Sequence, residues 1–121
     1  MIIWIASYPK SGNTWIRSFL TAYYFCENGI FDINKLNLIE DYPNKQFFKE
    51  KVKQGEIHKH WETSQKNIRD QKKVKFLKTH NSLITAFGND FTKPEYTLGV
   101  IYVIRDPRNV ITSVKNHNDL D

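Results

Sequence analysis

The chain has 121 residues, of which 40% are hydrophobic and 14% aromatic, a composition typical of one globular domain with a modest core. Its single cysteine, Cys26, excludes an intrachain disulfide and a cysteine-based metal site, and is typical of a reducing compartment. The formal charge of +5 is uneven, because residues 45–75 hold ten Lys or Arg against four acidic residues. We interpret that segment first as a solvated basic surface, with an anionic acceptor or a nucleic acid as the sharper alternative.

The chain begins with a short apolar run, Ile2 to Ala6, of strand length. Met1 precedes it directly, without a basic leader, a long apolar region or a spanning segment, so we expect a cytoplasmic protein with no membrane segment. A helix is predicted from Thr14 to Asn28, with Gly29 as its stop signal. The apolar residues at helical spacing in that helix are Trp15, Ile16, Phe19, Leu20 and Tyr23.

The middle of the chain carries weaker signals. Residues 30–44 contain Asp, Asn and Pro43 among scattered apolar residues, which indicates an irregular connection. Residues 45–73 are polar and rich in Lys, Gln and Glu, and we expect one or two surface helices there, with a break at Gly55.

Two further apolar runs, Val74–Thr79 and Leu98–Ile104, have strand length and are rich in Val, Ile, Phe and Tyr. We predict that both are central strands, the second buried on both faces. Turns are expected between them, at residues 88–90 and 93–94. Asp106 is a suitable N-cap for a following helix that begins at Pro107 and has an apolar stripe of Val110, Ile111 and Val114.

Strands that alternate with helical segments predict an α/β fold with a parallel sheet flanked by helices. In such sheets ligands bind beyond the carboxyl ends of the strands. Residues suited to anion chemistry stand at this end of each predicted strand. Lys10 lies just past the first strand, Lys78, Thr79 and His80 end the second, and Arg105 ends the third.

The loop Y-P-K-S-G-N-T-W at residues 8–15 is suited to bind an anion, because it joins a predicted strand to a helix N-terminus with unpaired N–H groups. Gly12 permits close approach of the backbone, Lys10 adds a full charge, and Ser11 and Thr14 add hydroxyl donors. A nucleoside-triphosphate loop has its lysine after the last glycine, whereas Lys10 precedes Gly12, which disfavours ATP or GTP.

Residues 8–15 closely resemble the 5′-phosphosulfate loop of sulfotransferases that use 3′-phosphoadenosine 5′-phosphosulfate (PAPS). The usual family word is Y-P-K-S-G-T-T-W, and Asn13 is the one departure, which a donor amide tolerant of turn conformations should permit. The stretch Y-V-I-R-D-P-R-N-V-I-T-S at residues 102–113 resembles the family's 3′-phosphate motif. Residues 78–80 resemble its K-T-H word.

The resemblance implies a P-loop-like three-layer α/β/α domain and a role for each matched residue. The donor PAPS would be bound by Lys10, Ser11, Gly12, Asn13, Thr14, Trp15, Arg105 and Ser113. The catalytic residues would be His80, as general base, with Lys10 and Lys78 stabilising charge. Trp15 would pack against adenine; burial in the core under the first helix is the alternative, and the two are not exclusive. The chemistry needs no metal, and we expect a small-molecule or carbohydrate acceptor with a hydroxyl or amine, and no nucleic-acid partner.

Family domains are longer, so we expect residues 1–121 to be the N-terminal portion of a single sulfotransferase-like domain, incomplete at its C-terminus and weakly active alone. No residue pattern indicates an oligomeric state. One alternative is a P-loop kinase or NTPase, which would need Asp106 to bind Mg²⁺. The other is a non-enzymatic, basic nucleotide-binding fragment, for which residues 45–75 would supply the charge.

Overall fold

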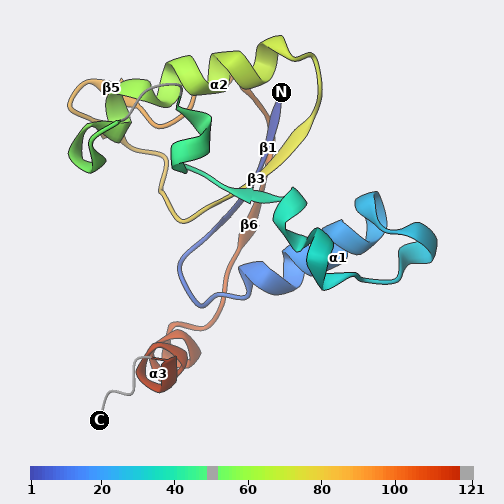
Figure 1. Ribbon diagram of the computed structural model, residues 1–121. Helices are drawn as coiled ribbons and strands as arrows, with labels where there is room; N and C mark the ends of the chain where they lie inside the picture. Colours follow the sequence, from blue (N-terminus) through green and yellow to red (C-terminus); the bar gives the residue numbers. More distant parts are fainter. Residues whose placement is uncertain (49–51, 118–121) are drawn as a thin grey trace.

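The structure, a computed structural model, describes residues 1–48 and 52–117 (Figure 1). In those ranges no helix has both the length and the apolar character needed to cross a bilayer. With η denoting a 3₁₀ helix, the elements in chain order are β1 (Ile2–Ser7), α1 (Asn13–Phe25), η1 (Glu27–Gly29), η2 (Ile33–Leu38), β2 (Glu40–Asp41), η3 (Lys45–Phe47), η4 (Gln54–His60), α2 (Trp61–Asp70), β3 (Lys75–Thr79), β4 (Thr85–Ala86), β5 (Asn89–Asp90), β6 (Thr97–Val103) and α3 (Pro107–His117).

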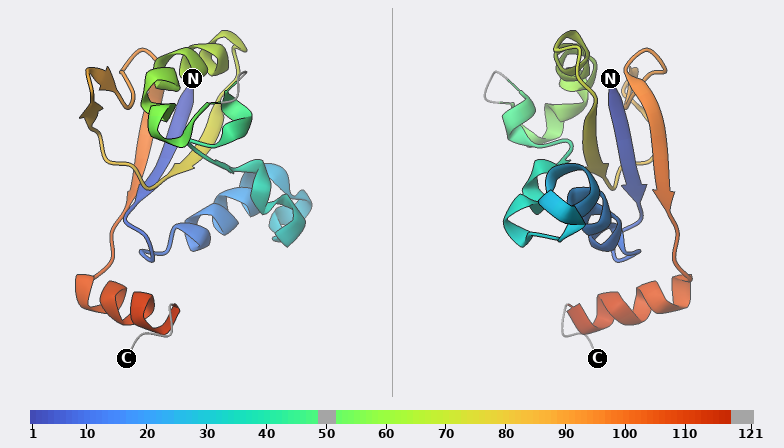
Figure 2. Two further views of the ribbon diagram at one scale, coloured as in Figure 1. Left: turned by 60° about the vertical axis from the view of Figure 1, so that its left-hand side comes forward. Right: turned by 90° about the vertical axis from the view of Figure 1, so that its right-hand side faces the viewer.

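The main sheet has the strand order β2-β3-β1-β6, and every neighbouring pair is parallel. Figures 1 and 2 show α1 and α2 on opposite sides of this sheet. The predicted α/β class with a parallel, helix-flanked sheet is therefore confirmed. Because the strands are parallel, the loops that follow β1, β3 and β6 all leave at one edge.

The core lies mainly on the face of the sheet that α2 covers. Ile2 and Trp4 alternate along β1 and point to that face, where they pack with residues of α2 and of the connecting segments. The cluster consists of Ile2, Trp4, Tyr42, Trp61, Ile68, Leu77 and Phe91. Ile5, on the opposite face of β1, is also fully buried. The central strand β1 is thus apolar on both faces, as is usual for an inner strand of a parallel sheet.

Helix α1 has the reverse of the usual amphipathic arrangement. Its buried positions, spaced four residues apart, are Asn13, Arg17 and Thr21. Its most exposed apolar side chains are Trp15, Phe19 and Tyr23, at 72%, 66% and 77% exposure. An apolar stripe at helical spacing ordinarily faces the core, and here it does not. The alternative that Trp15 is a core residue is therefore wrong.

Arg17 explains the polar interior of α1. Its guanidinium donates to the carbonyls of Leu36 and Ile39 at 3.1 and 2.7 Å, and it lies 3.8 Å from the Asp41 carboxylate. Burial lowers the pKa of Arg17, and the Asp41 charge opposes that shift. Arg17 therefore holds the segment of η2 and β2 against α1.

Several boundaries differ from those predicted. Helix α1 ends at Phe25 rather than Asn28, because Cys26 is already extended, with φ of −109° and ψ of 146°. Residues 30–44 are not wholly irregular, since β2 pairs with β3. Gly55 does not break a helix but lies within η4. The polar segment is not all surface, because α2 buries four residues: Trp61, Ser64, Gln65 and Ile68.

Strand β6 is an edge strand, not a central one. Within residues 1–48 and 52–117 it pairs only with β1, and Leu98, Val100 and Tyr102 on one face are 56%, 58% and 65% exposed. The prediction of burial on both faces was wrong, because an apolar run alone does not show what covers a strand. The turn predicted at residues 88–90 lies at residues 87–88, between the strands of the small β4–β5 hairpin, and Asn89 and Asp90 form β5 itself.

Helix α3 begins as predicted, at Pro107. The Asp106 carboxylate accepts a hydrogen bond from the Arg108 backbone N–H at 2.9 Å, in the manner of an N-cap. Of the expected stripe, Val110 is buried and Ile111 is 69% exposed. Figure 1 shows α3 beyond the carboxyl edge of the sheet.

Replacing Arg17 with Met should lower the free energy of unfolding by about 2–4 kcal/mol, because buried carbonyls that lose their donors cost about 1–3 kcal/mol each. Urea denaturation followed by circular dichroism measures this change. The control is Arg108→Met, at a position whose side chain is 89% exposed, where we expect less than about 0.5 kcal/mol. Equal losses in the two variants would contradict the anchoring role of Arg17.

Candidate functional site

A cavity of about 340 Å³ lies where the loops after β1, β3 and β6 meet. Its lining residues are Pro9, Lys10, Gly12, Asn13, Thr14, Trp15, Lys78, His80, Arg105 and Ser113. They include two lysines and an arginine, and none of those described is acidic. The three motif segments that the sequence singled out thus meet in one positively charged cavity.

The loop from β1 to α1 has an unusual backbone at two positions. Lys10 has a φ of 65° and Gly12 a φ of 99°. A β-carbon on Gly12 would meet no atom within 4 Å, so glycine is favoured there by its backbone angle rather than by space. Gly12 is also the N-cap of α1 and has no side chain to accept from the first-turn N–H groups. Asn13 and Thr14, the first two residues of α1, line the cavity, so the helix N-terminus lies at it as in a helix-terminal anion site.

Two residues of the motif contribute less to the cavity: Asn13 lines it but its side-chain amide is engaged within the fold, and Ser11 does not line it. The Asn13 side-chain amide donates to the Ile5 carbonyl and to Ser7 Oγ, both at 3.1 Å, so it fastens the start of α1 to the end of β1. Ser11 is buried and is not among the residues described as lining this cavity. The structure brings Lys10, Gly12 and Thr14 together at the cavity but leaves the Ser11 hydroxyl outside it.

His80 is held by the end of β1. Its Nδ1 lies 2.8 Å from the Ser7 carbonyl oxygen and 3.3 Å from Ser7 Oγ. Because a carbonyl only accepts hydrogen bonds, Nδ1 must carry the proton. In the neutral imidazole Nε2 is then the unprotonated nitrogen, with a lone pair available to an acidic proton.

Lys78 lies on the same strand end and is ion-paired. Its Nζ is 3.1 Å from Asp41 Oδ1, and Asp41 also lies beside Arg17. Together with His80, Lys78 forms part of a second, smaller cavity of about 210 Å³. The other residues of that cavity are Asp41, Tyr42, Pro43, Thr79 and Asn81. Lys78 and His80 therefore stand between two adjoining cavities.

Ser7 and Asp41 are site residues that sequence reasoning missed. Ser7 is the last residue of β1, directly before the recognised motif, and that position is the only signal it offers. Asp41 belongs to a two-residue strand with no apolar pattern. Its contact with Lys78 arises from pairing of β2 with β3, which no local signal predicts.

Arg105 joins the third loop to the first. The register pairs Ser7 with Val103, which brings the residues just beyond them side by side. Arg105 Nη1 donates to the Lys10 carbonyl oxygen at 3.0 Å. Ser113, half-buried on α3, lines the same cavity. The predicted pair of Arg105 and Ser113 is thus brought to one site.

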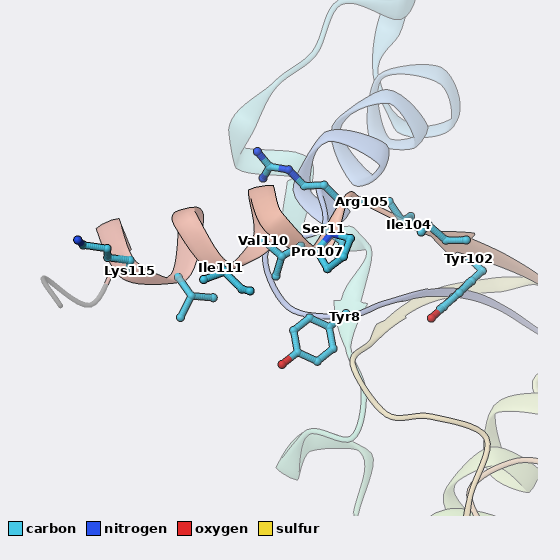
Figure 3. A pocket seen from close by; sticks show the side chains of 11 residues that line it. Tyr8, Ser11, Tyr102, Ile104, Arg105, Pro107, Val110, Ile111 and Lys115 are labelled. Atoms are coloured by element: carbon cyan, nitrogen blue, oxygen red, sulfur yellow. The ribbon is translucent and has the colours of Figure 1, made fainter. Parts of the chain in front are cut away.

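A larger cavity, of about 650 Å³, adjoins Arg105 (Figure 3). Its lining includes Tyr8, Ser11, Tyr102 and Val110, and is mostly apolar. Figure 3 shows the Arg105 guanidinium directed away from Tyr8 and Val110. Size favours this cavity, but cations, hydroxyl groups and helix N–H donors are concentrated in the smaller one. We therefore assign the candidate site to the 340 Å³ cavity.

A family model described as the sulfotransferase domain matches residues 2–120. The chain belongs to the sulfotransferase domain family. Searches of curated proteins and of solved structures return no significant match. Membership confirms the resemblance carried by residues 8–15, 78–80 and 102–113, and it supports sulfotransfer as the general activity.

The neutral imidazole of His80 should be the Nδ1-protonated tautomer, because the Ser7 carbonyl can only accept. Long-range ¹H–¹⁵N spectra of the imidazole rings at mildly alkaline pH report the tautomer directly. Ser7→Ala keeps the carbonyl and should leave the tautomer unchanged, while the exposed His117 serves as a reference. A proton found on Nε2 of His80 would contradict the geometry.

Proposed function

We propose that the protein transfers the sulfuryl group of PAPS to a hydroxyl or amine of a small-molecule or carbohydrate acceptor. The observation that carries this proposal is the single cavity in which Lys10, Lys78, His80, Arg105 and Ser113 meet. Family membership alone supports sulfotransfer. The choice of donor rests on two sets of anion-binding groups that line the cavity, one from the loop after β1 and one from the segment after β6.

The donor set fits a nucleotide with phosphates on both its 3′ and 5′ positions. From the first loop, Lys10, Thr14 and the α1 N-terminus would bind the 5′ phosphosulfate. From the segment after β6, the Arg105 guanidinium and the Ser113 hydroxyl would bind the 3′ phosphate. Trp15 lines the cavity with an exposed ring, which supports stacking against adenine. When bound, PAPS supplies the activated sulfuryl group.

Nε2 of His80 would accept the proton of the acceptor as its oxygen or nitrogen bonds to sulfur. Lys10 would stabilise the negative charge that develops on the departing 5′ phosphate, and Lys78 would act near the transferred group. The 210 Å³ cavity supports an approach for the acceptor, because Lys78 and His80 line it as well. Most of the rate enhancement would come from positioning and charge stabilisation.

The two alternatives have less support. A kinase or NTPase would need Asp106 for Mg²⁺, but its carboxylate is 2.6 Å from the Arg108 guanidinium and caps α3. A polyanion-binding surface would need free charge in residues 45–75. Three cations there are ion-paired, as Lys59–Glu56, Arg69–Asp70 and Lys75–Glu40.

Lys10→Ala should weaken binding of adenosine 3′,5′-bisphosphate by about 10–100-fold, as expected for the loss of a charged hydrogen bond. Isothermal titration calorimetry measures the dissociation constant. Lys66→Ala, on the exposed side of α2, removes the same charge away from the cavity and should change it less than about two-fold. Undiminished binding in Lys10→Ala, or tighter binding of ATP with Mg²⁺, would reject the assignment.

His80→Asn should lower sulfuryl transfer by about 10²–10⁴-fold, the usual contribution of a general base. Its affinity for adenosine 3′,5′-bisphosphate should stay within about two-fold of the wild type, because the imidazole is proposed to act on the acceptor. Labelled PAPS with a panel of alcohols, phenols and amines provides the assay. The matched control is His117→Asn, at the exposed end of α3. Equal transfer by the two variants would exclude His80 as the base.

A further inference from the structure

The loop after β1 contains a non-glycine residue in a sparsely populated conformation. Lys10 has a φ of 65°, in the left-handed region that a long side chain seldom adopts. Such a conformation costs free energy and persists only where surrounding contacts determine it. Within the loop, the Ser11 N–H donates to the Tyr8 carbonyl at a long 3.3 Å. A stronger contact is needed to keep the Lys10 peptide in place.

Arg105 makes that contact from a distant part of the chain. Its Nη1 donates to the Lys10 carbonyl oxygen at 3.0 Å, a charge-assisted hydrogen bond. The parallel β1–β6 ladder sets where the Arg105 backbone lies. Its last pair is Ser7 with Val103, so the segments that follow β1 and β6 start side by side. The exposed Arg105 side chain thus links the segment after β6 to the peptide that precedes the anion-binding turn.

A guanidinium has several N–H donors, so one bond to Lys10 leaves others for a ligand. The same side chain can hold the loop and bind an anion at once. A lysine at position 105 would have a single ammonium for both tasks.

We propose that Arg105 is a positioning residue for the 5′ anion loop, in addition to its proposed contact with the 3′ phosphate. The inference rests on the proposed function and deepens it. By holding the Lys10 carbonyl, Arg105 orients Lys10, Gly12 and the first turn of α1 for the 5′ group. The two ends of the donor site are then coupled through one side chain, and loss of Arg105 weakens both.

A ligand without a 3′ phosphate separates the two roles. Adenosine 5′-monophosphate cannot use Arg105 as a 3′-phosphate ligand, so its affinity reports the loop alone. Calorimetry should show that Arg105→Ala weakens its binding by about 10-fold, the size of one charged hydrogen bond. Arg108→Ala removes the same charge nearby, from a guanidinium that binds Asp106, and should change affinity less than about two-fold. The loss of affinity in Arg105→Ala should persist at high salt, because salt screens the long-range attraction between the positive charge and the nucleotide but not the effect of the hydrogen bond to Lys10.

The variant Arg105→Lys separates the two proposed roles, holding the loop and binding the 3′ phosphate, more finely. Its ammonium can still donate to the Lys10 carbonyl, so adenosine 5′-monophosphate binding should be largely restored. The extra affinity of adenosine 3′,5′-bisphosphate over the monophosphate should remain reduced, because the fork-shaped contact is lost. Restoration of both affinities together would overturn the dual role.

The ligand-free protein supplies an independent readout. Backbone amide chemical shifts of residues 10–14 should change in Arg105→Ala and stay constant in Arg108→Ala. Unchanged shifts, or wild-type affinity of Arg105→Ala for adenosine 5′-monophosphate, would overturn the inference while leaving the proposed function intact. If the wild type binds neither nucleotide, the proposed function fails, and the amide shifts still decide whether Arg105 holds the loop.

Discussion

β1 forms a parallel hydrogen-bonded ladder with β3 on one side and with β6 on the other, and these two ladders set the geometry of the site. Ala6 pairs with Thr79 and Ser7 with Val103, so three loops begin at nearly the same level. Pairing of the strand backbones therefore brings together chemical groups that are far apart in the sequence. A shift of one residue in either ladder would turn the strand side chains to opposite faces and separate these groups.

Hydrogen bonds across this edge then refine the arrangement. The Ser7 carbonyl orients the His80 ring, and the Lys10 carbonyl accepts a hydrogen bond from Arg105. On the far side, Arg17 ties α1 to the segment that carries Asp41, which in turn holds Lys78. Backbone carbonyls and one shared carboxylate thus position the charged side chains of the cavity.

Local patterns predicted much of this arrangement. Three apolar runs were recognised as strands, and the loops after them supplied nearly every residue of the cavity. The edge position of β6 was missed, because an apolar run shows that a strand can be buried but not which neighbours it has. The strand β2 was missed for a related reason: its two residues, Glu40 and Asp41, owe their conformation to pairing with β3. The boundary of α1 was placed too late because Gly29 was taken as the stop signal, whereas the chain becomes extended at Cys26.

By itself, the sequence determined the fold class and the family, because strand-length apolar runs and short motif words are local properties. Only the tertiary structure decided which groups touch. It turned the apolar stripe of α1 outward and buried Arg17, selected Asp41 as the partner of Lys78, and oriented His80 on the Ser7 carbonyl. These outcomes depend on strand register and on the hydrogen-bond needs of buried carbonyls, which are set by contacts between distant segments.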